Sequence, residues 1–208
     1  MLSESVGFLV FSTIEGVGLF VLMLSIFRLK ATDYMWQALF MILLMNLQSF
    51  FLRNELSLAY IVPLVNIVLF IFLLNTVVKI SLVWAGIVSI AGYLAFAIIQ
   101  TLILLVYFGS IDAAQSSIGN GYLTQSLSGV ISVLIAWGLY KFGIGFTFDF
   151  DRFRLKWEGI IVVLLIIIFL LVFTALLYKN ELSLNIVFFI CSLLFLLYYA
   201  LIKEKFND

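Results

Sequence analysis

The sequence predicts an all-α, polytopic membrane protein that forms a single seven-helix transmembrane domain over residues 1–208. Two observations lead to this fold class. Of the 208 residues, 65% are hydrophobic and only 11% are charged, and a water-soluble domain of this size could not cover so much apolar surface. The apolar residues also form seven runs, each close to the roughly 20 residues that an α-helix needs to cross a bilayer.

Short polar segments separate the seven runs, which cover residues 6–27, 34–52, 56–78, 81–108, 122–142, 158–178 and 182–203. The four residues Met1–Glu4 lack the basic character of a secretory signal, so we expect the first run to remain as a membrane helix. The fourth run is rich in small residues, and Ala85, Ser89 and Gly92 share one helical face. Because small faces let membrane helices approach closely, we expect this helix at the centre of the bundle.

The basic residues predict the orientation of the chain. Nine of the eleven Lys and Arg residues follow the first, third, fifth and seventh runs, and only Arg53 and Lys179 lie on the other side. Because cytoplasmic segments carry the excess of Lys and Arg, the N-terminus is expected outside and the C-terminus inside. This pattern predicts a multi-pass protein of the cell membrane.

A six-residue pattern occurs twice, at Arg53–Leu58 and at Lys179–Leu184, and reads as basic residue, Asn, Glu, Leu, Ser, Leu. One interpretation is local, because Asn caps a helix and Glu suits its positive N-terminal end. The other is an internal repeat. The segment Thr13–Arg28 also resembles Ser126–Lys141 without a gap, so the first three helices would correspond to the last three in a 3+1+3 layout.

Two polar loops have distinctive compositions. The segment Gly109–Gln125 contains Gly, Ser and Asn and is expected to be a mobile outer loop, either a lid or a simple connector. The inner segment Gly143–Trp157, which includes Phe146, alternates aromatic and polar residues. Rings at the headgroup level and cations beside anionic lipid favour an interfacial role over a partner-docking surface. The residues expected there are Phe148, Phe150, Arg152, Arg154 and Trp157.

Glu15 is the one ionisable residue deep inside a predicted span. It lies roughly 13 Å down the first helix at 1.5 Å per residue, and a carboxylate at mid-bilayer costs about 2.5–3.5 kcal/mol on insertion scales. No Lys or Arg lies at a similar depth in any run. We therefore expect a neutral carboxylic acid that bonds to Asn66 or Gln100, either as a functional group or only as a link between helices.

Four amides lie at comparable heights: Asn46 and Gln48 in the second run, Asn66 in the third and Gln100 in the fourth. With Glu15, we expect Asn46, Asn66 and Gln100 to line a polar pocket that opens outward. The alternative is that these amides only bond helices to one another. Pro63, inside the third run, is expected to allow a kink.

The sequence lacks the common signs of catalysis. It has no His, one Cys and a net charge of zero, and it contains none of the usual hydrolase, metalloprotease or nucleotide-binding motifs. We expect no enzyme activity, no metal, no cofactor and no nucleic acid partner. The lipid bilayer is the expected partner, and self-association is left open.

The seven-span layout, ending in Ala200–Phe206, resembles the membrane sensor region of AgrC- and ComD-type peptide-sensing histidine kinases. The resemblance covers the whole chain in layout but includes no specific motif. It implies a receptor-like or accessory signalling module that senses an extracellular or membrane ligand. Because the sequence stops at Asp208 without a kinase, such a module would need a separate membrane or kinase partner.

The 3+1+3 layout is also similar to that of the SWEET sugar transporters, which makes a small-solute transporter or channel the alternative function. The Pro-Gln pair typical of that family is absent, since the single proline lies in Val62-Pro63-Leu64. The two halves therefore cannot both contain a helix-kinking proline at equivalent positions.

Overall fold

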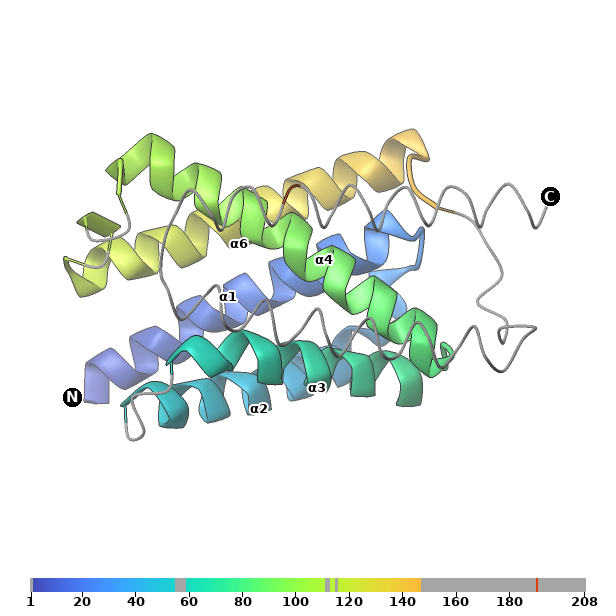
Figure 1. The fold of residues 1–208 in the computed structure, drawn as a ribbon, viewed down its shortest axis with the longest axis horizontal. Coiled ribbons are helices and arrows are strands. Elements are labelled where there is room, and N and C mark those ends of the chain that lie inside the picture. The colour runs from blue at the N-terminus through green and yellow to red at the C-terminus, as the bar shows by residue number, and fades with distance from the viewer. Residues whose placement is uncertain (1, 55–58, 111–112, 115, 147–189, 191–208) are drawn as a thin grey trace.

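The computed structural model describes residues 2–54, 59–110, 113–114, 116–146 and 190, and the elements in this part of the chain are helical (Figure 1). The all-α prediction is confirmed there. The long helices are α1 (Leu2–Ile26), α2 (Met35–Asn54), α3 (Val62–Thr76), α4 (Leu82–Ile103) and α6 (Ile118–Phe142). Two 3₁₀ turns, η1 (Ala31–Tyr34) and η2 (Ala59–Ile61), precede α2 and α3, and a π-helical turn, η3 (Leu104–Phe108), extends α4.

Five helical segments in the described residues are long and apolar enough to cross a membrane: Val6–Ile26, Ala31–Arg53, Ala59–Thr76, Leu82–Phe108 and Ile118–Phe142. These segments match the first five predicted runs closely. The sixth and seventh runs, 158–178 and 182–203, lie outside the described residues. The predicted count of seven spans therefore stays a prediction.

The five helices alternate in direction along the chain (Figure 1). Helices α1, α3 and α6 run one way, and α2 and α4 run the other. Tight turns make this alternation possible: Arg28 and Lys79 adopt left-handed backbone angles, with φ of 51° and 64°. The side chain of Asn75 donates to the carbonyl of Ile80 at 2.8 Å and closes the turn before α4. This alternation puts Arg53 at the N-terminal end of the bundle and the other described basic residues at the opposite end.

Helix α4 is the most deeply buried of the five spans and packs against α1, α3 and α6. Ala85 and Ser89 are fully buried. A Cβ added at Gly92 would lie 2.5 Å from the Cβ of Met23 on α1, so the absence of a side chain permits that contact. The prediction of a central fourth helix with a small face is confirmed within the described bundle.

Among the glycines of the described helices, those of α1 and α6 come closest to a neighbouring backbone. The sequence analysis did not predict this contact. A Cβ on Gly18 would lie 2.6 Å from the carbonyl oxygen of Gly129, and a Cβ on Gly129 would lie 2.8 Å from the carbonyl oxygen of Ile14. Because apolar burial gives little driving force inside lipid, such close van der Waals packing is a main source of helix association. These two glycines therefore hold α1 and α6 together.

Two expectations at the start of α3 are wrong. Pro63 occupies the first turn of α3, where a missing backbone N–H breaks no helical hydrogen bond, so it does not kink the helix. Asn54 is the last residue of α2 and not the cap of the next helix. Residues 55–58 and 179–184 lie outside the described part of the chain, as do the predicted last two helices. The internal repeat therefore remains a prediction.

The expected outer loop Gly109–Gln125 is shorter than predicted, because α6 already begins at Ile118. The Ser117 side chain accepts a hydrogen bond from the backbone N–H of Asn120 at 3.2 Å and caps the helix. The Asn120 side chain in turn donates to the carbonyl of Ala113 at 3.0 Å. This capping stabilises a first turn that contains poor helix formers, so composition alone was misleading.

At the opposite end of the bundle, Phe146 of the expected interfacial segment packs beside the end of α1. Its backbone N–H donates to the carbonyl of Ile26 at 2.9 Å, and its ring lies 5.8 Å from that of Phe27. The other residues expected at the interface, which are Phe148, Phe150, Arg152, Arg154 and Trp157, lie outside the described residues. Their role stays a prediction.

Candidate functional site

The buried carboxyl group of α1 meets an amide from α4. The side chain Nε2 of Gln100 donates to Oε1 of Glu15 at 2.8 Å. Glu15 and Gln100 are 85 residues apart in the chain, and the antiparallel packing of α1 and α4 brings them to the same depth. The predicted hydrogen bond between Glu15 and Gln100 is thus present. Both side chains lie inside the bundle, partly shielded from the surroundings.

A second amide approaches Glu15 from α6. Gln125 lies within hydrogen-bonding reach of the Glu15 carboxyl group, and its Nε2 donates to the hydroxyl of Ser12 at 3.1 Å. Its carbonyl oxygen Oε1 is buried and has no hydrogen-bond partner within the described structure. Sequence reasoning missed Gln125 because it was assigned to a loop. Its position on the inner face of α6 makes it part of the site.

Tyr93, on α4, connects Glu15 with α3. Asn66 lies within hydrogen-bonding reach of the Tyr93 hydroxyl, and Tyr93 lies close enough to Glu15 for the two to interact electrostatically. The Asn66 oxygen Oδ1 is buried without a partner in the part of the chain that the structure describes. Sequence reasoning missed Tyr93, although it lies two helical turns before Gln100 and so on the same face of α4.

We call these five side chains the Glu15 cluster: Glu15, Asn66, Tyr93, Gln100 and Gln125. They come from α1, α3, α4 and α6. Gln100 and Gln125 can stabilise either protonation state of the Glu15 carboxyl group, since amides both donate and accept. Asn66 joins the cluster through Tyr93. The cluster therefore has the chemistry to bind a polar group at the middle of the bundle.

The amides of α2 take different positions. Asn46 donates to the hydroxyl of Thr13 at 3.0 Å, and that hydroxyl donates to the carbonyl of Leu9 at 2.7 Å. Asn46 thus links α2 to α1 next to the Glu15 cluster, but no hydrogen bond joins it to Glu15 in the described structure. Gln48 is partly buried, and its two buried amide atoms find no partner among the described residues. Two residues apart on a helix, Asn46 and Gln48 face different directions.

Arg53 acts on the Glu15 cluster from the end of α2. Its side chain is exposed, yet it lies close enough to interact electrostatically with both Glu15 and Tyr93. No ion pair between Arg53 and Glu15 forms in this part of the structure. Arg53 belongs to the last turn of α2, so its backbone does not lie at the depth of Glu15.

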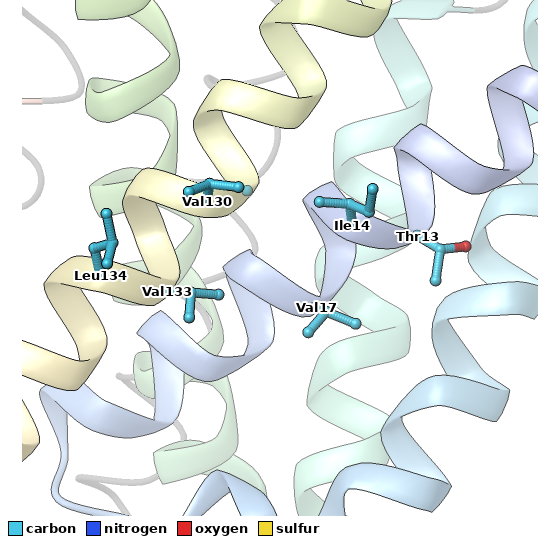
Figure 2. A pocket seen from close by; sticks show the side chains of 7 residues that line it. Thr13, Ile14, Val17, Val130, Val133 and Leu134 are labelled. Carbon is cyan, nitrogen blue, oxygen red and sulfur yellow. The ribbon is translucent and has the colours of Figure 1, made fainter.

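A separate groove of about 320 Å³ lies between α1 and α6. Figure 2 shows its lining side chains, with the Thr13 hydroxyl turned away from the labelled residues of α6. The groove opens on the outer surface of the bundle, since Ile14, Val130 and Leu134 are exposed. The residues that line it are Thr13, Ile14, Val17, Gly129, Val130, Val133 and Leu134. This apolar groove is not the polar pocket predicted around Glu15.

Among the described residues, no group of three His, Cys, Asp or Glu side chains is arranged to hold a metal ion. Comparisons with protein-family models, with curated proteins and with solved structures found no match. The functional argument therefore rests on the residues of the site.

Proposed function

We propose that the protein is a non-catalytic, multi-pass cell-membrane receptor that binds a small polar ligand at the Glu15 cluster and passes the signal to a separate partner. The observation that carries the proposal is an ionisable side chain near mid-span whose neighbouring amides keep unpaired atoms. Ligand binding would occur from the end of the bundle that carries Arg53, which the distribution of basic residues assigns to the outside.

The unpaired atoms favour a binding site over a set of links between helices. A buried polar atom without a partner costs about 1–3 kcal/mol. Asn66 Oδ1 and Gln125 Oε1 are both in this state within the described structure. Purely structural links would use these atoms for hydrogen bonds between helices. A ligand that bonds to them recovers the lost energy and so gains affinity.

The position of the cluster also explains how binding could be sensed. Its residues belong to four helices that otherwise pack through apolar side chains and small faces. A ligand that bonds to more than one helix stabilises one arrangement of the bundle over another, and differential affinity for two arrangements is what shifts a conformational equilibrium. The alternating helices transmit such a change to the opposite end, where we place the partner.

A small-solute transporter is the second candidate, and one observation favours it. Glu15 lies near the middle of its span, and transporters hold substrates near the bilayer midplane between helices. Transport and sensing make different demands on the same site. A transporter must release its ligand on the opposite side of the membrane, whereas a receptor need not.

The proposal is tested with the purified full chain in detergent and in liposomes. Small polar solutes are screened for a rise in thermal unfolding temperature, and each hit is retested with Glu15→Gln. Asp33→Asn is the matched control, because it makes the same acid-to-amide change at an exposed residue of η1. We expect hits that stabilise the wild type and Asp33→Asn but not Glu15→Gln.

Hits that stabilise Glu15→Gln as strongly as the wild type would refute a site at Glu15, as would the absence of any hit. Uptake of a bound solute into liposomes then separates the two functions. Binding without uptake supports the receptor, and uptake that is lost in Glu15→Gln supports the transporter.

A further inference from the structure

We propose that α1 and α6 form a binding site for one anionic phospholipid, with an acyl chain in the groove between the two helices and the phosphate group bound by Arg28 and Lys141. The site is separate from the Glu15 cluster, so the inference holds whether or not that cluster binds a ligand. It follows from the apolar groove and from two cations at the end of the same two helices.

The groove offers only carbon atoms to its occupant. Thr13 is the one polar residue of the lining, and its hydroxyl points away from the labelled residues of α6 (Figure 2). That hydroxyl accepts a hydrogen bond from Asn46 at 3.0 Å and donates to the carbonyl of Leu9 at 2.7 Å. A polar solute would lose its hydrogen bonds with water in the groove, whereas a hydrocarbon chain has none to lose.

The groove is too small to hold a helix. A helix with its side chains is about 10 Å across and rises 5.4 Å per turn, so a single turn occupies about 420 Å³ as a cylinder. The whole groove has a volume of about 320 Å³. An acyl chain is thinner and flexible, and it surrounds the middle of a spanning helix in any bilayer. The groove lies at that depth, because residues 13–17 and 129–134 are near the middle of their spans.

One face of α6 leads from the groove to a basic side chain. This face contains Val130, Leu134, Trp137 and Lys141, all of them exposed. Their spacing of three or four residues keeps them on one side of the helix. The 11 residues from Val130 to Lys141 span about 16.5 Å at 1.5 Å per residue, which is close to the roughly 15 Å depth of one hydrocarbon leaflet. A lipid whose phosphate lies beside Lys141 therefore extends its chain into the groove.

Lys141 is available to an anion. Its ammonium group lies 4.7 Å from the centre of the Trp137 ring, and that ring is 60% exposed. The ring attracts the cation through its quadrupole but carries no negative charge to neutralise it. Tryptophan is also the residue type that favours the headgroup level of a membrane.

Arg28 comes to the same place from the end of α1. A Cβ on Gly143 would lie 3.7 Å from Nη2 of Arg28, and Gly143 follows Lys141 by two residues. The chain after α6 is held against the end of α1, because the backbone N–H of Phe146 donates to the carbonyl of Ile26 at 2.9 Å. A guanidinium group binds phosphate with two parallel hydrogen bonds, and the nearby ammonium group adds a second positive charge.

The charge at this end of the bundle favours an anionic lipid over a zwitterionic one. The described basic residues there are Arg28, Lys30, Lys79 and Lys141, and the one carboxylate among the described residues at that end is Asp33. The distribution of basic residues assigns this end to the cytoplasm, where the leaflet carries anionic lipid. A zwitterionic headgroup would bring a cation of its own next to these charges, whereas an anionic headgroup balances them.

The experiment measures lipid binding to the purified full chain in detergent by native mass spectrometry. The probes are phosphatidylglycerol and phosphatidylcholine with the same acyl chains, and glycerol 3-phosphate is the competitor without a chain. Lys141→Gln and Arg28→Gln each remove one cation. Lys79→Gln is the matched control, since Lys79 is exposed at the same end and shares the left-handed backbone of Arg28, with φ of 64° and 51°.

The groove is tested by Val130→Phe, which fills it with a larger side chain. Val68→Phe is its control, because it makes the same change at an exposed valine of α3 outside the groove. Lys141→Arg keeps the positive charge and should bind phosphatidylglycerol within a few-fold of the wild type. This result would show that a loss in Lys141→Gln does not come from misfolding.

We expect one molecule of phosphatidylglycerol to bind at least about tenfold more tightly than phosphatidylcholine, as for one charge-assisted contact. Lys141→Gln and Arg28→Gln should each weaken phosphatidylglycerol binding about tenfold, and Lys79→Gln should not. Val130→Phe should weaken the binding of both lipids, whereas Val68→Phe should weaken neither. Glycerol 3-phosphate should not displace the lipid, because it has no chain for the groove.

Equal binding of the two lipids, or an equal loss in Lys79→Gln, would overturn the inference, since the charges would then act without a defined site. Displacement by glycerol 3-phosphate would also overturn it, because the phosphate alone would account for binding. A dimer in the same spectra that Val130→Phe dissociates would show that a second copy of the chain covers the groove, and this too would overturn the lipid site.

Discussion

The contact between α1 and α6 provides a prediction whose size follows from the structure. In Gly18→Ala, the new Cβ would lie 2.6 Å from the carbonyl oxygen of Gly129, whereas ordinary contact begins at 3.4 Å. The two backbones must therefore separate by about 0.8 Å, because a backbone atom cannot rotate away as a side chain would. We expect Gly18→Ala to destabilise the protein by about 1–3 kcal/mol, the usual range for overpacking.

The matched control is Gly138→Ala on α6, where an added Cβ meets no atom within 4 Å. Alanine is the better helix former by about 1 kcal/mol in a soluble helix, so this variant should be neutral or more stable. The assay is thermal unfolding followed by circular dichroism in the same detergent. If Gly18→Ala is as stable as Gly138→Ala, the close approach of α1 and α6 is not as the structure shows.

Three further predictions concern the polar side chains and the topology. Glu15→Gln should change the free energy of unfolding by less than about 1 kcal/mol, whereas Glu15→Leu leaves the Gln100 amide unpaired and should cost about 1–3 kcal/mol in the same assay. A double-mutant cycle on Asn46→Leu and Thr13→Val should give a coupling of about 0.6 kcal/mol, the average for membrane hydrogen bonds, and zero coupling would contradict the bond. A reporter active only outside the cytoplasm should work at Ser117 and be silent after Lys205, and the reverse would overturn the orientation.

Much of the described fold could be predicted from hydropathy, because a helix that crosses lipid must satisfy its own backbone and be apolar along its length. The central position of α4 followed from its small residues. The start of α6 could not be predicted in this way, since Gly119, Asn120 and Gly121 are typical of loops. The hydrogen bonds of Ser117 and Asn120 stabilise the first turn of α6, and they depend on local geometry.

The site was predictable in part. Glu15 and Gln100 are conspicuous because polar side chains are rare in membrane spans, and the structure joins them. The role of Tyr93 was not predictable, because a tyrosine in an apolar run is usually a packing residue.

The most direct test of the central claim is infrared difference spectroscopy of the protein with and without a ligand found in the solute screen. The claim is that ligand binding acts on the Glu15 carboxyl group. We predict a ligand-induced change in a carboxyl or carboxylate stretching band that disappears in Glu15→Gln and persists in Asp33→Asn. A bound ligand that leaves the Glu15 band unchanged would contradict the account.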